Sequence, residues 1–394
     1  MKVLLVTPGW PTHVFMIVPL AWALRVQGHE VRVASPPSGI DAVVRAGLPA
    51  VELGPDIDLL ELRRRAARYE TAGNEKPADE AEVRNRLAGE DGSRIMAVWQ
   101  EISFSATKDL VGFARSWRPD LVVSDSLVAG GLVAGRAIGV PAVRHLFGID
   151  ILGTEAGEGL LGMLPGYHDR FRRYGVEVTG DPAHLTLSPF PPSMQPATPA
   201  RLPMRYIPYN GPAELPSWLL QPAERPRTVI TWGTSSAWSA GEHTVRIPQI
   251  LDALADSDGE TVVTIGRDQR PLVGEPPPGV RLVENVPLHF LMPSCDLLVH
   301  QGGASTMLTA ASYGVPQLTV PHLNEQIQDA EAHAATGAGI CLPAERAEVP
   351  ELRDALKALR SDPAYHRAAG RIRAEMQAQP SPVRTVRVLE ELVG

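Results

Sequence analysis

One stretch of the chain is so rich in proline that it divides the sequence in two. Between residues 188 and 226, prolines stand at positions 189, 191, 192, 196, 199, 203, 208, 212, 216, 222 and 226. Proline lacks a backbone N–H and disrupts helix interiors and central strands, so neither a long helix nor a buried strand fits here. The chain has 394 residues, which is also more than one ordinary hydrophobic core supports. We therefore expect one folded domain before this segment and another after it.

Both halves alternate short apolar runs with helical stretches. The expected strands are 2–7, 31–35, 119–125 and 141–145 in the first half, and 228–232, 261–265, 280–283, 296–300 and 317–320 in the second. Apolar runs without alternation are typical of parallel strands that are buried on both faces. The pattern predicts an α/β fold with two doubly wound, Rossmann-like domains.

Three further segments are predicted from composition. A loop over residues 8–15 should lead into a helix that ends near Gln27, because Gly28 suits the position after a helix. Residues 56–118 are more polar, and we interpret them as a solvated helical insert, with the segment 56–58 as a helix start. After residue 320 the remainder should be helical.

Composition excludes several classes of protein. The formal net charge is −8 and the pI is near 5.8, which argues against a nucleic-acid partner. Cys295 and Cys341 are far apart and lack neighbouring ligand pairs, so neither a disulfide framework nor a zinc site is indicated, and we expect no metal. The apolar run 3–6 is too short for a signal peptide, and the run 127–143 is too short for a membrane span. We expect a cytoplasmic protein.

The strongest chemical motif is the segment 300–306, His-Gln-Gly-Gly-Ala-Ser-Thr. It follows an expected strand, and open α/β sheets bind ligands at the carboxyl ends of their strands. Gly302 and Gly303 allow a close approach of the backbone, and the next residues start a helix whose free N–H groups favour an anion such as phosphate. The alternative is a tight turn with Ser305 or Thr306 as an ordinary helix cap.

A second candidate site lies at the carboxyl ends of two strands in the first half. His13 follows the first strand and Asp125 ends the strand 119–125. A histidine near its ordinary pKa takes protons at neutral pH, and a carboxylate that orients it stabilises the charged ring. The alternative is a surface histidine and an aspartate that caps a helix.

These segments resemble glycosyltransferases of the GT-B fold that use nucleotide-sugars, and the resemblance covers essentially the whole chain. The family carries a His-x-Gly-Gly-x-Ser/Thr stretch, followed later by an acidic residue and Gln, which here are Glu325 and Gln326. The segments 191–194 and 206–211 look more narrowly like actinomycete enzymes that glycosylate polyketide antibiotics with deoxysugars.

The resemblance implies two Rossmann-like domains facing across a cleft. The expected division is 1–208 for the acceptor-binding domain, 209–226 for the linker and 227–394 for the nucleotide-sugar-binding domain, with the last helix returning to the first domain. The resemblance also implies that His13 is the general base and that Asp125 is its partner. The residues implied for the donor diphosphate are His300, Gly302, Gly303, Ala304, Ser305, Thr306, Thr234 and Ser235; for the nucleoside Asn285, Val286 and Leu288; and for the donor sugar Asn324, Glu325 and Gln326.

One departure from the family bears on the donor. Many members that use UDP-sugars have a glutamate for the ribose hydroxyls a few residues into the helix, where this chain has Met307, Leu308 and Thr309. A missing carboxylate suits a 2′-deoxyribose, so dTDP is favoured over UDP. The expected activity is an inverting transfer of a deoxysugar to a hydrophobic aglycone, with the nucleotide-sugar as co-substrate and no other cofactor.

Several alternatives stay open from the residues alone. The same scaffold suits a UDP-sugar-dependent enzyme, a C-glycosyltransferase, and an epimerase or hydrolase of nucleotide-sugars. It also suits a non-catalytic helper of another transferase. A homodimer and a requirement for an auxiliary protein are further alternatives. His29, His243, His289 and His333 are interpreted as lacking a catalytic role, whereas His322 is a candidate for the sugar pocket.

Overall fold

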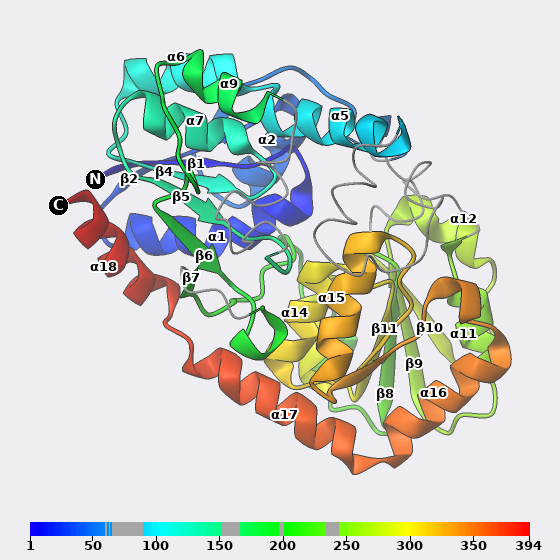
Figure 1. Cartoon of the computed structure of the whole chain (residues 1–394). Helices are drawn as coiled ribbons and strands as arrows, with labels where there is room; N and C mark the ends of the chain where they lie inside the picture. The colour runs from blue at the N-terminus through cyan, green and yellow to red at the C-terminus, as the bar shows by residue number, and fades with distance from the viewer. Residues whose placement is uncertain (60, 63, 65–89, 151–165, 197–200, 234–243) are drawn as a thin grey trace. The chain divides into compact units, whose positions relative to one another are not determined.

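The computed structural model describes residues 1–59, 61–62, 64, 90–150, 166–196, 201–233 and 244–394. It divides into two compact units (Figure 1). Unit 1 comprises Met1–Pro189, Pro196–Arg205 and Pro380–Gly394, and unit 2 comprises Phe190–Gln195 and Tyr206–Gln379. Within the described residues, no helix combines the length and the apolar character that crossing a bilayer requires.

Unit 1 is built on a seven-stranded parallel sheet with the order β3-β2-β1-β4-β5-β6-β7. Its strands are β1 (Lys2–Val6), β2 (Glu30–Ser35), β3 (Ala50–Glu52), β4 (Leu121–Asp125), β5 (Ala142–His145), β6 (Leu185–Ser188) and β7 (Arg201–Pro203). Strand β1 pairs with β2 on one side and with β4 on the other. The carboxyl ends of β1 and β4 therefore lie side by side, which is where the two expected catalytic residues stand.

Helices cover both faces of this sheet (Figure 1). They are α1 (Pro11–Val26), α2 (Pro37–Arg45), α5 (Glu90–Phe104), α6 (Thr107–Trp117), α7 (Ala129–Ala137), α9 (Tyr167–Arg172) and α18 (Pro382–Val393). Helices α6 and α7 pack together on one face, and α1 packs against α18 on the other. The final helix of the chain thus belongs to unit 1, together with the N-terminal strands.

Unit 2 has a six-stranded parallel sheet with the order β10-β9-β8-β11-β12-β13. Its strands are β8 (Arg227–Thr231), β9 (Glu260–Ile265), β10 (Val280–Glu284), β11 (Leu297–His300), β12 (Gln317–Thr319) and β13 (Gly339–Cys341). Strand β11 lies between β8 and β12. The chain crosses from β8 outward through β9 to β10 and then returns to β11, so the carboxyl ends of β8 and β11 mark the switch point of the sheet.

The helices of unit 2 also lie on both faces of its sheet (Figure 1). They are η1 (Pro192–Met194), η2 (Ser217–Leu220), α11 (Ile247–Ala253), η4 (Arg267–Gln269), α12 (Arg270–Val273), α13 (Leu288–Leu291), η5 (Met292–Ser294), α14 (Ala304–Tyr313), α15 (Asn324–Ala335), η6 (Ala344–Arg346), α16 (Val349–Ser361) and α17 (Pro363–Ala378). Helices α14 and α17 pack on one face, and α11 packs against α16 on the other. Two parallel-sheet α/β domains, predicted from the alternation of apolar runs, are confirmed.

The start of α1 differs from the sequence-based prediction. The helix begins at Pro11, so most of the expected loop 8–15 is helical and His13 lies in the first helical turn. Proline is well suited to the first helical position, because its missing N–H would have no partner there.

Two other predictions need correction. Helix α6 is no solvated insert, because Leu110, Val111 and Ala114 are 1%, 1% and 0% exposed and belong to the core of unit 1. The chain after residue 320 is not entirely helical, because strand β13 closes the edge of the second sheet.

The expected helix start at Asp58 is confirmed, since Asp58 Oδ1 accepts a hydrogen bond from the Glu61 N–H at 2.9 Å.

Candidate functional site

A histidine and an aspartate meet at the carboxyl edge of the sheet in unit 1. His13 Nδ1 donates to Asp125 Oδ2 at 2.8 Å, and both side chains are buried. Asp125 Oδ1 accepts the Leu127 N–H at 2.8 Å, so the carboxylate is held at both oxygens. Because Nδ1 carries the proton shared with Asp125, Nε2 of His13 is the nitrogen that can accept a proton from a substrate.

Aromatic side chains fix the plane of the His13 ring. Phe147 stacks on it with ring centroids 3.4 Å apart and an interplanar angle of 12°. Trp10 approaches with a centroid distance of 6.2 Å and a tilt of 37°. Phe147 lies just beyond the end of β5 and was not identified from the sequence. The stacked ring leaves the edge of His13, rather than its covered face, to receive an acceptor hydroxyl.

A second histidine lies beside the dyad without competing for its aspartate. His145 ends β5 and is the register partner of Asp125 in the neighbouring strand. Complete burial lowers the pKa of His145 to about 4, although the Asp125 carboxylate acts in the opposite direction. His145 is therefore neutral at pH 7, and the Asp125 charge is directed to His13.

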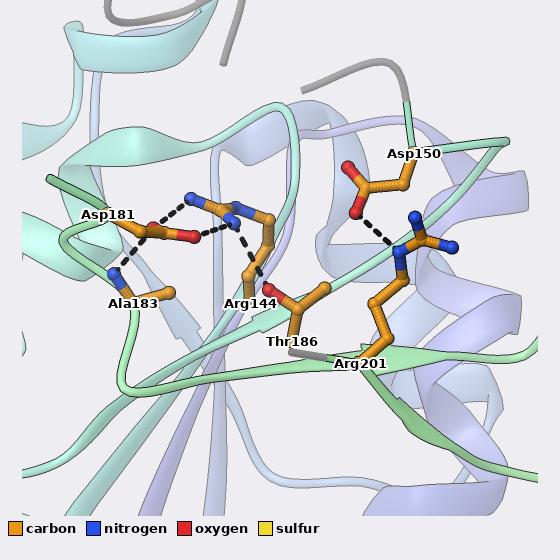
Figure 2. Close-up of polar contacts among 6 residues, drawn as sticks. All are labelled: Arg144, Asp150, Asp181, Ala183, Thr186 and Arg201. Atoms are coloured by element: carbon orange, nitrogen blue, oxygen red, sulfur yellow. Dashed lines mark hydrogen bonds and ion pairs between the residues drawn. The ribbon is translucent and has the colours of Figure 1, made fainter. Parts of the chain in front are cut away.

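Two ion pairs hold the strands next to this site (Figure 2). Arg144 on β5 donates to both carboxylate oxygens of Asp181 at 2.8 and 2.6 Å, and to the Thr186 hydroxyl at 3.1 Å. Arg201 Nε donates to Asp150 Oδ2 at 2.8 Å. The Asp181 carboxylate raises the pKa of Arg144 despite the opposing effect of its burial. The first pair ties β5 to the loop before β6, and the second ties β7 to the loop after β5.

In unit 2, the His-Gln-Gly-Gly motif forms the turn between β11 and α14. His300 is the last residue of β11, Gly303 is the N-cap of α14, and the helix begins at Ala304. Gly302 has a φ of +92°, a conformation that favours glycine. Ser305 and Thr306 follow in the first helical turn, where backbone N–H groups have no partner within the helix. This is the anion-binding geometry that the motif predicted.

The imidazole of His300 is engaged within the protein. Its Nδ1 accepts the Gly302 N–H at 3.1 Å, and its Nε2 lies 2.9 Å from Gln317 Oε1. Complete burial lowers the pKa of His300 to about 3, so the ring is neutral. The sequence-based interpretation had His300 meeting the diphosphate charge directly, whereas this geometry uses the ring to hold the loop.

The residues expected at the donor sugar lie next to that loop. Asn324, Glu325 and Gln326 form the first turn of α15, at the carboxyl end of β12. A Cβ atom placed on Gly302 would lie 3.2 Å from both Cβ and the carbonyl oxygen of Gln326. Gln326 Oε1 accepts the His322 and Leu323 N–H groups at 3.4 Å each, which fixes the start of the helix. The structure thus brings the expected diphosphate and sugar residues together.

The expected nucleoside residues follow β10, at the same edge of the sheet. Asn285 adopts a φ of +54° and donates its N–H to the Ile265 carbonyl at 2.9 Å. The Val286 carbonyl accepts the Thr264 hydroxyl at 3.3 Å, and Leu288 is buried at the start of α13. Asparagine tolerates the left-handed conformation, so its presence is consistent with the sharp turn.

The segment 206–211 is hydrogen-bonded to helix α14. The Tyr206 hydroxyl lies 3.0 Å from the Thr309 hydroxyl and 3.3 Å from that of Ser305. Asn210 Nδ2 donates to Thr309 Oγ1 at 3.2 Å, and Asn210 Oδ1 accepts the His289 N–H at 3.0 Å. His289, interpreted from the sequence as lacking a catalytic role, is thus bonded to Asn210.

Thr234 and Ser235, also expected at the diphosphate, lie outside the described residues, as does His243. Within the part of the chain that the structure describes, no group of three or more His, Cys, Asp or Glu side chains is arranged to hold a metal ion. The residues missed from the sequence are Phe147, Gln317 and His333. Gln317 carried a signal, because it is a polar residue with a long side chain at the start of an expected buried strand.

Comparisons with known proteins cover both units. Residues 22–233 match the family described as erythromycin biosynthesis protein CIII-like, N-terminal domain, and residues 248–392 match its C-terminal domain. The aclacinomycin-T 2-deoxy-L-fucose transferase of Streptomyces galilaeus is 36% identical over 100% of this chain and 96% of its own length. The 10-deoxymethynolide desosaminyltransferase of Streptomyces venezuelae is 36% identical over 100% and 97%. The crystal structure of the glycosyltransferase VinC in complex with dTDP aligns with a TM-score of 0.78 and 32% identity, over 100% of this chain and 99% of that one.

Proposed function

The chain belongs to the erythromycin biosynthesis protein CIII-like family and is a glycosyltransferase of the GT-B type, and we propose that it transfers a deoxysugar from a dTDP-sugar to a hydrophobic natural-product aglycone. The relatives named for deoxysugar transfer match the chain over its whole length, which supports this substrate class. The observation that carries the proposed chemistry is the hydrogen bond between His13 and Asp125 at the sheet edge of unit 1.

The proposed reaction is a single displacement with inversion. His13 Nε2 takes the proton of an acceptor hydroxyl, and the acceptor oxygen forms a bond to the anomeric carbon of the sugar. The bond from that carbon to the diphosphate oxygen breaks, and dTDP leaves with the electron pair. Asp125 stabilises the protonated ring of His13. The first-turn amides of α14 stabilise the negative charge that develops on the departing diphosphate.

The side chains of helix α14 support the proposal that the donor nucleotide is dTDP and not UDP. Met307, Leu308 and Thr309 are all completely buried in α14, and none carries a carboxylate that could bind a ribose 2′-hydroxyl. The Thr309 hydroxyl is already bonded to Tyr206, Asn210 and the Ser305 carbonyl. A site that offers no partner to the 2′-hydroxyl discriminates against the ribonucleotide, because that hydroxyl would lose its hydrogen bonds to water.

A small apolar cavity of about 20 Å³ lies in unit 1. It is lined by the first loop (Val6 to Gly9), by Leu53 and Ile57, and by the helical residues Ile102 and Leu110. The first loop leads directly into the turn of α1 that carries His13. This volume holds about one water molecule, so the proposed hydrophobic acceptor rests on the relatives and not on this cavity.

The experiment is isothermal titration of the full chain with dTDP and with UDP. We expect clearly tighter binding of dTDP, weakened in His300→Ala and unchanged in His366→Ala, a matched substitution at an exposed position of α17. Mass spectrometry then follows product formation from dTDP-desosamine and 10-deoxymethynolide as the first donor and acceptor. Equal binding of UDP would contradict the dTDP assignment, and the absence of nucleotide binding would contradict transferase activity and favour a helper protein.

A further inference from the structure

A buried hydrogen-bond network joins three elements of unit 2. His300 on β11, Gln317 on β12 and His333 on α15 are 0%, 0% and 1% exposed. Gln317 Oε1 lies 2.9 Å from His300 Nε2, and Gln317 Nε2 lies 3.0 Å from His333 Nε2. Gln317 Nε2 also donates to the Met307 carbonyl of α14 at 3.2 Å. One glutamine side chain thus connects the end of β11, the donor helix α14 and the interior of α15.

The direction of every hydrogen bond in this network follows from one backbone group. The Met307 carbonyl can only accept, so the amide nitrogen of Gln317 must face it and the amide oxygen must face His300. An oxygen facing His300 Nε2 requires that this nitrogen carries the proton. His300 Nδ1 is then an acceptor, and it receives the Gly302 N–H at 3.1 Å. By the same logic His333 Nε2 accepts from Gln317, so the proton of His333 is on Nδ1.

Both histidines have to be neutral for this arrangement to hold. A proton on His300 Nδ1 would face the Gly302 N–H, and a proton on His333 Nε2 would face the Gln317 amide. Burial lowers the pKa of His300 to about 3 and that of His333 to about 4. The neutral forms are therefore the only ones populated near pH 7.

The network determines the shape of the motif turn. It directs the Gly302 N–H inward, and Gly302 packs against Gln326 and Pro321, where an added Cβ would lie 3.2 and 3.3 Å from its neighbours. The amides that remain for a ligand are those at the start of α14. His333 belongs to the same helix as Asn324, Glu325 and Gln326, so the network reaches the expected sugar residues as well.

We propose that Gln317 and His333 are positioning residues for the nucleotide-sugar. Together they hold His300 in the tautomer that anchors the turn between β11 and α14. They also tie this turn to α15, the helix that carries the expected sugar-binding residues. The proposal rests on the proposed function, because it assigns the turn after β11 to the diphosphate. Neither residue is expected to touch the ligand itself.

The test compares two ligands that differ only in the diphosphate. Gln317→Met keeps the side-chain volume but removes every hydrogen bond of the amide, and we expect dTDP to bind about 10-fold more weakly. Thymidine lacks the diphosphate, so its affinity should change by less than about 2-fold. The matched control is Thr319→Val, which removes a side-chain hydrogen bond from the same strand, to the Ile340 carbonyl, and should leave both affinities unchanged. Calorimetry gives the affinities, and thermal unfolding reports whether each variant is folded.

A second pair of variants covers the case in which Gln317→Met does not fold. His333→Leu removes the acceptor for the Gln317 amide, whereas the side-chain oxygen of His333→Gln restores one. We expect His333→Leu to weaken the binding of dTDP and of the dTDP-sugar, and His333→Gln to recover most of it. Folded Gln317→Met or His333→Leu with unchanged dTDP affinity would overturn the proposal, as would an equal loss of thymidine binding. If the unmodified chain binds neither ligand, the proposed function fails before any variant is compared.

Discussion

His13 Nδ1 lies 2.8 Å from Asp125 Oδ2, although 112 residues separate the two in the chain. The pair forms because β1 and β4 are neighbours in the sheet, so the first turn of α1 and the end of β4 meet at one edge. Asp125 is held at its other oxygen by the Leu127 N–H, and Phe147 covers one face of the imidazole. The arrangement leaves Nε2 of His13 as the single ring nitrogen that can take a proton from an acceptor.

Asp125→Asn should lower kcat by about 10²- to 10⁴-fold, because the amide removes the negative charge that stabilises the protonated His13 and disturbs its tautomer. Donor affinity should stay the same, since the nucleotide is assigned to unit 2. Steady-state kinetics with varied donor separates kcat from KM. The control is Asp120→Asn, the same change at an exposed aspartate that accepts the Lys2 N–H. A rise in KM with unchanged kcat would argue against the assigned role of Asp125.

Gly302→Ala should weaken dTDP binding by about 10-fold or more, because the new Cβ would press on Gln326 and Pro321 in a backbone conformation of φ +92°. Gly139→Ala is the matched control. Gly139 has a φ of +75° and no atom within 4 Å of an added Cβ, so this variant has the backbone strain without the steric conflict. Calorimetry with dTDP should show a loss for the first variant alone. Equal affinities in the two variants would mean that the packing of Gly302 is irrelevant to the donor.

The free energy of unfolding should fall as the pH decreases from 6.5 toward 4. Burial lowers the pKa of His145 to about 4, of His300 to about 3 and of His333 to about 4, whereas each ring titrates at 6.5 without the fold. In this window the unfolded chain binds protons that the folded chain does not, so stability rises with pH, by up to about 1.4 kcal/mol per pH unit for each histidine. Urea unfolding at pH 7, 6 and 5 measures the slope. His145→Asn should make it shallower, and a flat profile in the unmodified chain would contradict the assigned burial.

Asp150→Ala should destabilise the protein by about 3 kcal/mol, because it leaves the Arg201 guanidinium buried without its carboxylate. The double variant Asp150→Ala with Arg201→Met should recover much of this loss, since both charges of this pair are then removed (Figure 2). Asp169→Ala is the control, because Asp169 pairs with Arg172 on the surface, and its loss should cost no more than about 1 kcal/mol. Chemical denaturation of the unmodified chain, Asp150→Ala, Arg201→Met and the double variant decides between coupled and additive effects.

Much of the fold follows from local sequence patterns. Continuous apolar runs located β1, β2, β4, β5 and the strands β8 to β12, and the proline-rich segment separated the two α/β halves. Short edge strands were harder, because β3, β7 and β13 have three residues each and their pattern is set by pairing rather than by composition. Helix α6 was misjudged because its buried residues are interspersed with charged ones, and only its packing against α7 shows which face is covered.

The candidate sites were predictable where a residue stands at the end of a strand. His13, Asp125 and the 300–306 motif all lie at the carboxyl edges of their sheets, as the α/β topology requires. The partners of these residues were not predictable. Phe147 and His333 meet their histidine and glutamine neighbours only through tertiary packing, and the sequence shows no spacing that links Gln317 to His300.

His13 is assigned to the acceptor and not to the nucleotide. The most direct measurement compares the unmodified chain with His13→Ala in two assays: the rate of glycoside formation at saturating donor, and the affinity for dTDP by calorimetry. We expect a rate lower by about 10²- to 10⁴-fold and a dTDP affinity within about 2-fold of the original. A folded His13→Ala protein that forms glycoside at the original rate, or that loses dTDP binding, would contradict this assignment.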